Sequence, residues 1–234
     1  NQSSAGSRPK VAGPSRSASH GWRPVPGGDS GRILNGGSRA VGMDGLDVTA
    51  CERCPELCAS RSRIVNGVGP TDADLLFVGE GPGANEDEQG EPFVGRSGDV
   101  LDETLREVGL DRADVRITNC VRCRPPDNRD PHKEELANCR EYLDREIDRV
   151  DPELVVTLGK VPAQHLLERD VAVTGEAGDV ADVAVDGGPQ PVLLCVHPAA
   201  TLYDPSQKAT FKSALEKAAE FTDGESGQKR LGDF

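Results

Sequence analysis

Residues 74–83 read DLLFVGEGPG, a short apolar run that passes into a turn with three glycines. An apolar run of this length, followed at once by Gly and Pro, predicts a strand that is buried on both faces. Strands of this kind occur mostly in parallel sheets, where ligands bind in the turns beyond the carboxyl ends. The stretch therefore predicts an α/β fold and marks its Gly-rich turn as a candidate site.

On both sides of this stretch, apolar strand-like segments alternate with amphipathic helical ones. Ser97 is expected to cap a helix that Gly109 ends. Such alternation implies a parallel sheet with helices on both faces. We predict a three-layer αβα sandwich around a central, mainly parallel four-stranded sheet. The expected strands are residues 74–79, 115–119, 154–158 and 192–196, and the expected helices are 98–108, 133–150, 160–168 and 206–221.

The two ends of the chain differ in composition from its middle. Residues 1–42 are rich in Gly, Ser and Pro and contain six of the Lys and Arg residues but one acid, Asp29. Such a segment buries too little apolar surface to offset its ordering entropy. We expect a disordered extension over 1–42, a folded domain over 43–222 and a flexible tail over 223–234. Met43, the single Met of the chain, is the expected natural start.

The whole chain has a net charge of −13. Residues 43–234 carry all of the excess negative charge, because 39 Asp and Glu face 21 Lys and Arg there. Of all the basic residues, 20 are Arg and 7 are Lys. An acidic, Lys-poor composition of this kind predicts a halophilic, cytoplasmic protein. No apolar run reaches the roughly 18 residues that a membrane span requires. We therefore expect no membrane association.

Seven cysteines, an odd number, argue against a disulfide framework and favour metal or cluster ligation. Cys51 and Cys54 form one pair at chelating spacing, and Cys120 and Cys123 form a second. The two pairs together could make a four-Cys zinc site, or four of the thiolates could hold an iron–sulfur cluster. Spacing alone does not decide between these two. Cys195 lies in an apolar strand and is expected to be an inert core thiol.

The Gly-rich turn also fits a dinucleotide fingerprint, with Gly79, Gly81 and Ala84 in the required positions. Pro82 argues against this, because it removes a backbone donor that phosphates would use. Glu80 and the acids at 86–88 surround the turn with negative charge, which opposes a pyrophosphate. The turn better suits a neutral, flat ligand.

Three blocks in order, with a Cys pair before them, give the chain a specific resemblance. They are GEGPGA at 79–84, followed by GEPFVGRSG at 90–98; TNCVRCRPPDNR at 118–129; and HPA at 197–199. In these blocks the chain resembles the family 4 uracil-DNA glycosylases, the iron–sulfur class of bacteria and archaea, over about residues 48–222. The resemblance implies a monofunctional DNA glycosylase that hydrolyses the N-glycosidic bond of uracil in base-excision repair. It also implies a structural [4Fe–4S] cluster held by Cys51, Cys54, Cys123 and Cys139.

Uracil must leave the base stack to reach the enzyme, and the pocket must then recognise it. By the resemblance, Phe93 stacks on the base, Asn119 reads it, and the turn formed by Glu80, Gly81 and Pro82 binds its carbonyl oxygens. A neutral side-chain amide can donate to O4 of uracil and accept from its N3–H, whereas cytosine reverses both groups. His197 matches the residue that stabilises the departing uracil anion at O2.

The group that positions the attacking water is left open among Glu80, Glu86 and Asn128. Glu86 has a second reading, in which it crowds the C5 position and excludes thymine. For contact with DNA we predict Arg96, Arg124 and Arg129, together with Arg122, on the phosphates, and Leu202 as a wedge beside Tyr203.

The expected partner is uracil-containing DNA, single- or double-stranded, with a sliding clamp as a candidate second partner and a monomer as the expected state. Two other classes compete with the glycosylase. One is a zinc-stabilised adaptor that binds nucleic acid or protein without catalysis, and the other is a nucleotide-dependent α/β enzyme. The adaptor needs neither Asn119 nor His197, so these two residues discriminate between the hypotheses.

Overall fold

The computed structural model describes residues 46–185 and 188–222. The predicted extension at 1–42, the start at Met43 and the tail at 223–234 lie outside these described residues. Within them, no helix is both long and apolar enough to cross a membrane.

A mixed sheet of five strands, in the order β2-β1-β3-β5-β4, forms the centre of the domain. Four strands are parallel: β1 (Leu75–Gly79), β2 (Arg116–Asn119), β3 (Leu154–Leu158) and β5 (Gly188–Cys195). These are the four strands expected from the sequence, and their residues are almost all buried, as their apolar runs require.

The fifth strand, β4 (Val180–Val185), corrects the expected count of four. It pairs antiparallel with β5 at the edge of the sheet. In β4, Val183 is buried while Asp182 and Ala184 are exposed. An edge strand with one solvated face lacks the continuous apolar run that identified the other four.

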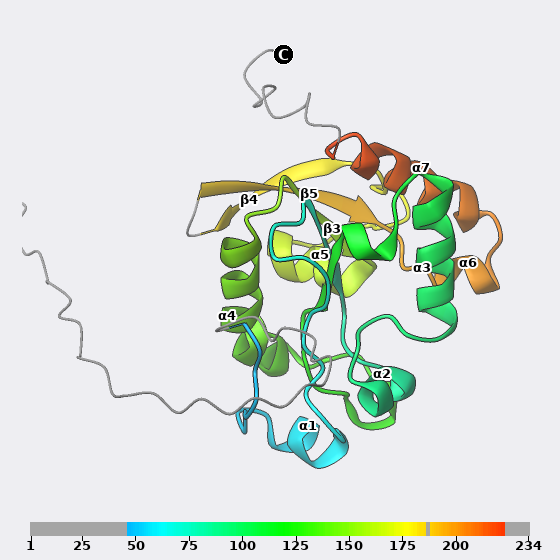
Figure 1. The fold of residues 1–234 in the computed structure, drawn as a ribbon. Helices are drawn as coiled ribbons and strands as arrows, with labels where there is room; N and C mark the ends of the chain where they lie inside the picture. Colours follow the sequence, from blue (N-terminus) through cyan, green and yellow to red (C-terminus); the bar gives the residue numbers. More distant parts are fainter. Residues whose placement is uncertain (1–45, 186–187, 223–234) are drawn as a thin grey trace, which may run out of the picture. The chain divides into compact units, whose positions relative to one another are not determined.

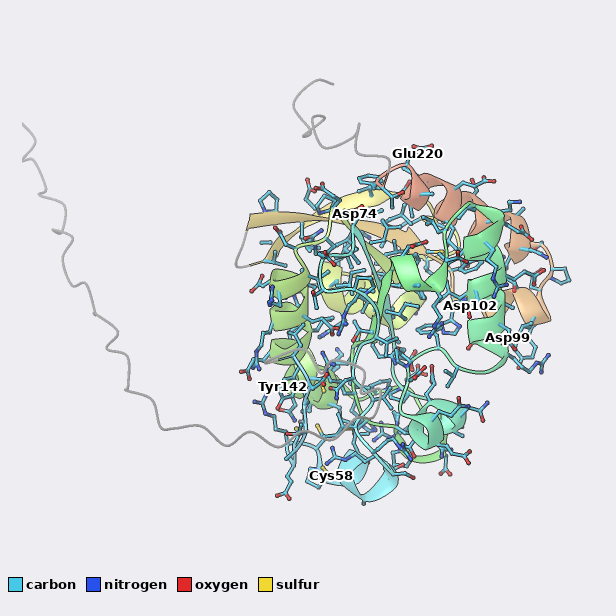
Figure 2. The ribbon with its side chains drawn as sticks, in the orientation of Figure 1. Cys58, Asp74, Asp99, Asp102, Tyr142 and Glu220 are labelled. Atoms are coloured by element: carbon cyan, nitrogen blue, oxygen red, sulfur yellow. The ribbon has the colours of Figure 1, made fainter. Side chains whose placement is uncertain are left out.

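Helices cover both faces of the sheet, which confirms the predicted αβα sandwich (Figure 1). On one face, α4 (Lys133–Val150) and α5 (Lys160–Leu167) pack Leu143, Ile147 and Leu166 against β1, β3 and β5. On the other face, α3 (Arg96–Glu107) and α7 (Gln207–Ala219) pack Leu101, Leu105 and Phe211. Figure 2 labels a residue on each side, Tyr142 on α4 and Asp102 on α3.

Five short helices connect these elements. They are α1 (Pro55–Ser60), α2 (Ala84–Gln89), η1 (Arg112–Asp114), η2 (Pro126–Asn128) and α6 (Ala200–Tyr203). The predicted cap of α3 is wrong, because Gly95 takes that position, with φ +99°, and Ser97 lies inside the helix. The earlier start brings Gly98 against the carbonyl oxygen of Phe93, where a Cβ would lie 1.8 Å away. The start of α3 is therefore fixed by its contact with the Phe93 loop.

Candidate active site

The carboxyl ends of the parallel strands bring the predicted base-binding residues together. Gly79 ends β1 and pairs with Asn119, the last residue of β2. A Cβ on Gly79 would lie 2.4 Å from Asn119 Oδ1 and 2.5 Å from Phe93 Cε2. Only a residue without a side chain allows both groups to approach the strand this closely. Gly79 therefore forms the floor on which the Phe93 ring and the Asn119 amide meet.

Asn119 carries an unused hydrogen-bond donor at this floor. Its Nδ2 is buried and has no partner among the described residues. Buried polar groups normally have a hydrogen-bond partner, because an unpaired one costs about 1–3 kcal/mol. An orphan donor next to an aromatic ring is the arrangement expected of a site that awaits a flat, polar ligand.

His197 lies beside Phe93 and completes the group. The two ring centroids are 5.7 Å apart, with the ring planes tilted by 31°. Behind the imidazole, a Cβ on Gly159 would lie 3.2 Å from His197 Cβ. Phe93, Asn119 and His197, which are separated by up to 104 positions in the sequence, thus share one site.

The protonation state of His197 follows from its surroundings. Burial lowers its pKa to about 4, so the ring is neutral at pH 7. The backbone N–H of Ala199 donates to Nδ1 over 3.1 Å. A neutral imidazole that accepts at Nδ1 carries its proton on Nε2. His197 therefore offers an N–H donor at Nε2.

Glu80 begins the Gly-rich turn, and the pKa of its carboxyl lies near neutrality. Burial, followed by the charge of the adjacent Asp130 carboxylate and a hydrogen bond with it, raises the pKa of Glu80 to about 7. The Val121 N–H donates to the Glu80 carbonyl oxygen over 3.1 Å. A Cβ on Gly81 would lie 2.6 Å from Val121 Cγ2, so the turn packs closely against the chain after β2.

Glu86 uses both of its carboxylate oxygens on the backbone. One accepts from the Gly83 N–H and the other from the Phe93 N–H. Burial raises the pKa of Glu86, while these two hydrogen bonds and the charge of Arg112 act in the opposite direction. These contacts favour a role in holding the Phe93 loop over a role in positioning water.

Asn128, the third candidate for the water-positioning role, lies exposed in η2. Its Oδ1 accepts from Arg124 Nε over 2.8 Å. Asn128 therefore contacts Arg124, which was predicted to contact DNA. Among the described residues, the Glu80 carboxylate has no backbone hydrogen bonds like those that Glu86 accepts from Gly83 and Phe93. Glu80 is therefore the remaining candidate for positioning water.

One predicted phosphate contact is wrong. Arg122 is buried and donates to Glu146 Oε2 over 2.6 Å. The same carboxylate binds Arg116 through Oε1 at 2.7 Å. Glu146, on α4, is thus the centre of a buried ion-pair network, and Arg122 cannot serve DNA without breaking it. Breaking a buried pair of this kind costs about 3–5 kcal/mol.

The other predicted DNA contacts stay at the surface. Arg96 is exposed at the start of α3, and Arg124 is half-buried. Arg129 is held by Glu135 at 2.8 Å and by Glu56 at 2.9 Å, so its charge is largely neutralised locally. In α6, directly after the His197 segment, Leu202 is half-buried and Tyr203 is 83% exposed. Tyr203 is the more prominent of the two.

The predicted cluster ligands come from three places: the segment into α1, the loop after β2, and α4. Cys54 and Cys123 pack together with Leu57. Asn138 Nδ2 donates to Cys54 Sγ over 3.5 Å. Arg61 donates to Cys123 Sγ over 2.9 Å and to the Cys51 carbonyl oxygen over 2.7 Å.

Packing distinguishes Cys120 from the candidate ligands Cys54 and Cys123. Burial raises the pKa of Cys54, Cys123 and Cys139, that of Cys139 to about 11. Cys139 is close enough to Cys123 and Cys54 to be influenced by their charges. Cys120 instead packs in the core beneath α4 with Leu76 and Leu143, which does not suit the pairing of 51/54 with 120/123. Across the described part of the chain, no three His, Cys, Asp or Glu side chains converge to hold a single metal ion.

Sequence reasoning missed several residues that shape this site. Arg112 binds the carbonyl oxygens of Pro92 and Phe93, Asp130 contacts Glu80, and Arg61 contacts two of the cysteine segments. Each acts on a group that is distant in sequence or part of the backbone. No local motif could have identified these partners.

The comparisons with known proteins agree with this geometry. Residues 66–219 match the uracil DNA glycosylase superfamily. The sheet and the group at its carboxyl edge thus define a class of DNA glycosylases, and the chain belongs to the uracil DNA glycosylase superfamily. A type-4 uracil-DNA glycosylase of Archaeoglobus fulgidus is 39% identical over 187 residues, covering 76% of this chain and 94% of that protein. Similar proteins of the same name occur in Sulfurisphaera tokodaii, 38% identical over 188 residues (76% and 85% covered), and in Thermotoga maritima, 39% identical over 177 residues (74% and 90%).

Proposed function

We propose that this protein is a uracil-DNA glycosylase that hydrolyses the bond between uracil and deoxyribose and leaves an abasic site. The observation that carries the proposal is the orphan Asn119 Nδ2 donor, buried beside Phe93 and the neutral His197. The type-4 uracil-DNA glycosylases named above, which the chain matches over about three quarters of its length, support the same reaction.

Recognition begins when the uracil nucleotide rotates out of the duplex, which costs a few kcal/mol. The Phe93 ring provides the face on which the base stacks. Asn119 Nδ2 donates to uracil O4 and Oδ1 accepts from N3–H. Cytosine presents an amino group and an unprotonated nitrogen at these positions, so it would face donor against donor and acceptor against acceptor.

Cleavage leaves negative charge on uracil, mainly at O2, and positive charge on the sugar. The His197 Nε2–H is the donor assigned to O2, supported by the Ala199 N–H that fixes the proton on Nε2. The backbone N–H groups of Glu80 and Gly81 are further donors for the uracil carbonyl oxygens. Donors that are already oriented before the reaction stabilise the developing charge without reorganisation.

Glu80 is the residue to which we assign positioning of the attacking water and support of the sugar cation. Its pKa of about 7 means that the carboxyl is mainly protonated below neutrality and ionised above it. We expect kcat for uracil release to rise with pH through about 7. Since Asp130 contributes to the raised pKa, Asp130→Asn should move the midpoint to lower pH, and Glu80→Gln should remove it. Single-turnover rates from pH 5.5 to 8.5 measure this, and a midpoint that persists in Glu80→Gln would assign the step to another group.

DNA is proposed to approach over Arg96 and Arg124, with Tyr203 and Leu202 entering the duplex from α6. This local arrangement provides positive groups on a domain whose net charge is strongly negative. A sliding clamp, the monomeric state, the cytoplasmic location and the halophilic origin stay predictions from the sequence.

We also propose that Cys51, Cys54, Cys123 and Cys139 hold a [4Fe–4S] cluster. Each thiolate of such a cluster binds a different iron, so the four need not converge on one ion as zinc ligands do. The burial of Cys54, Cys123 and Cys139, and the packing of Cys54 with Cys123, suit that donor set. When bound, the cluster would connect α1, the loop after β2 and α4, and the residues that act on uracil would remain those described above.

The proposal is tested by incubating the protein, purified without oxygen, with an oligonucleotide that contains one central uracil. Alkali then cuts the strand at the abasic site. We expect cleavage by the parent protein and a reduction of about 10²–10³-fold in His197→Ala, the usual effect of removing one such donor. A control oligonucleotide with thymine or cytosine in place of uracil should stay intact. No cleavage by a folded, iron-loaded parent protein would contradict the proposal and leave a cluster-bearing binder, or an enzyme for a different DNA lesion, as the next hypothesis.

A further inference from the structure

We propose that Arg112 is a positioning residue that holds the Phe93 peptide, and with it the stacking ring, in the geometry that binds uracil. The inference deepens the proposed function, because it rests on Phe93 being the face on which the base stacks. Arg112 lies in η1, between α3 and β2, and no motif of the sequence pointed to it.

Phe93 needs to be held because its backbone adopts a conformation that L-residues avoid. Its φ is +52°, in the left-handed region, and the residue is only 4% exposed. A bulky residue in this region persists where its surroundings over-determine it, and such residues cluster at ligand sites. The relevant question is therefore which groups hold the peptides on either side of Phe93.

Two side chains and one glycine hold this segment. Glu86 accepts from the Phe93 N–H. Arg112 Nη1 donates to the Phe93 carbonyl oxygen over 3.3 Å, and Nη2 donates to the Pro92 carbonyl oxygen. Gly98, at the start of α3, lies so close to the Phe93 carbonyl that no larger residue fits. One guanidinium thus fixes two successive carbonyl groups, which sets the rotation of the peptide planes around Phe93.

The guanidinium is itself fixed from α3. Asp102 Oδ1 accepts from Arg112 Nη1 over 2.9 Å, and both side chains are 25% exposed (Figure 2 labels Asp102). The charge of Arg112 also acts on Glu86, which accepts from the other end of the Phe93 residue. Within the described residues, none of the hydrogen bonds that Arg112 makes involves Asn119 or His197. Its hydrogen bonds therefore act on the site through the Phe93 segment.

The position of the ring depends directly on these contacts. The Phe93 ring contacts Gly79 on one side and lies 5.7 Å from the His197 ring. A rotation of the peptide planes would carry the ring away from the Asn119 amide. Removing Arg112 should thus weaken the capture of uracil without changing the groups that contact phosphates.

The test compares Arg112→Ala and Arg112→Lys with Arg106→Ala, which removes an exposed Arg from the neighbouring helix α3. Four quantities are measured on the full chain: the single-turnover rate, the inhibition constant of free uracil, the affinity for abasic-site DNA, and the thermal midpoint. The parent protein must release uracil for the comparison to apply. If it does not, the proposed function fails, and that result is separate from the outcome for Arg112.

For Arg112→Ala we expect the rate and the affinity for free uracil to fall by roughly tenfold to a hundredfold, the range for losing a base stacked on an aromatic ring. Affinity for abasic-site DNA should stay within about threefold of the parent, since phosphate contacts set most of it. Arg112→Lys should give an intermediate loss, because a lysine keeps the charge but cannot bind two carbonyls and Asp102 as a planar fork. Arg106→Ala should match the parent.

The inference would be overturned if Arg112→Ala bound free uracil within about twofold of the parent affinity. The difference between Arg106→Ala and the parent sets the precision of this comparison. It would also be overturned if affinity for abasic-site DNA fell by the same factor as affinity for uracil while the thermal midpoint dropped. That result would indicate that Arg112 only stabilises the fold. If Arg112→Ala does not fold, Arg112→Lys decides by the same criteria.

Discussion

Asn119→Asp is expected to lower kcat/KM for uracil release by about a thousandfold or more, with little change in fold. The substitution keeps the shape of the side chain and exchanges the Nδ2 donor for an oxygen. The pocket then presents an acceptor to uracil O4, which is also an acceptor. A site built to hydrogen-bond its substrate discriminates by about 10⁴–10⁵-fold against a partner that leaves its buried polar groups unpaired. The loss should be smaller than that limit, because Oδ1 can still accept from N3–H.

The measurement is single-turnover uracil release over a range of DNA concentrations, with circular dichroism to confirm folding. Thr118→Val is the matched control. Thr118 is also buried at the end of β2, and its Oγ1 likewise has no partner among the described residues. Replacing this hydroxyl with a methyl group of the same shape should leave activity within about threefold of the parent. Because the hydroxyl makes no hydrogen bond with the described residues, its removal should not lower the stability of the fold. If Asn119→Asp kept more than about a tenth of the parental activity, Asn119 would not be the residue that recognises uracil.

The sequence predicted the fold well where burial alone shapes the pattern. The helix expected at 133–150 is α4 at the same bounds, and the apolar runs marked all four parallel strands. It failed at β4 and at the start of α3, for different reasons. β4 is an edge strand with one solvated face, so it lacks the continuous apolar run that marked the other strands. α3 begins two residues before its predicted start, where Gly98 lies against the Phe93 carbonyl, a contact that the residues next to Gly98 do not reveal.

The same division applies to the site. Phe93, Asn119 and His197 were predicted on motif blocks, and the structure brings them together at one sheet edge. Arg122 lies in one of those blocks and was wrongly assigned to DNA, because its partner Glu146 is 24 positions away on α4. A motif identifies the residue types of a site, whereas the partner that neutralises a charge is fixed only by the fold.

Cys123→Ala is expected to abolish iron binding and to destabilise the domain by several kcal/mol, on the order of 5, because the binding free energy of a structural metal group is folding free energy. Domains of this size are stable by only about 5–15 kcal/mol. The variant should therefore lose the brown colour of the parent, contain little iron, and aggregate or unfold near 37 °C. Iron and zinc content and the thermal midpoint, measured after anaerobic purification, provide the test.

Cys58→Ala is the matched control for this substitution. Cys58 lies in α1, a few residues after Cys51 and Cys54, and is half-buried. Its Sγ donates to the Cys51 carbonyl oxygen over 3.4 Å. As a non-ligand, it should leave the iron content at about four per chain and the thermal midpoint within a few degrees. If Cys58→Ala lost its iron and Cys123→Ala kept it, Cys58 would be a cluster ligand in place of Cys123. One zinc per parental chain in place of iron would contradict the cluster itself.

The position of Cys123 explains why its loss should reach beyond the cysteines. It follows Arg122, whose buried pair with Glu146 fixes the chain to α4, and it precedes Arg124, a predicted phosphate contact. Asn119 lies only four positions earlier, at the end of β2. A cluster at this point would hold both the reading amide and the DNA-contacting loop in register with α1 and α4. We therefore expect uracil release to fall together with iron content across partially loaded preparations of the parent protein, in proportion to the loaded fraction.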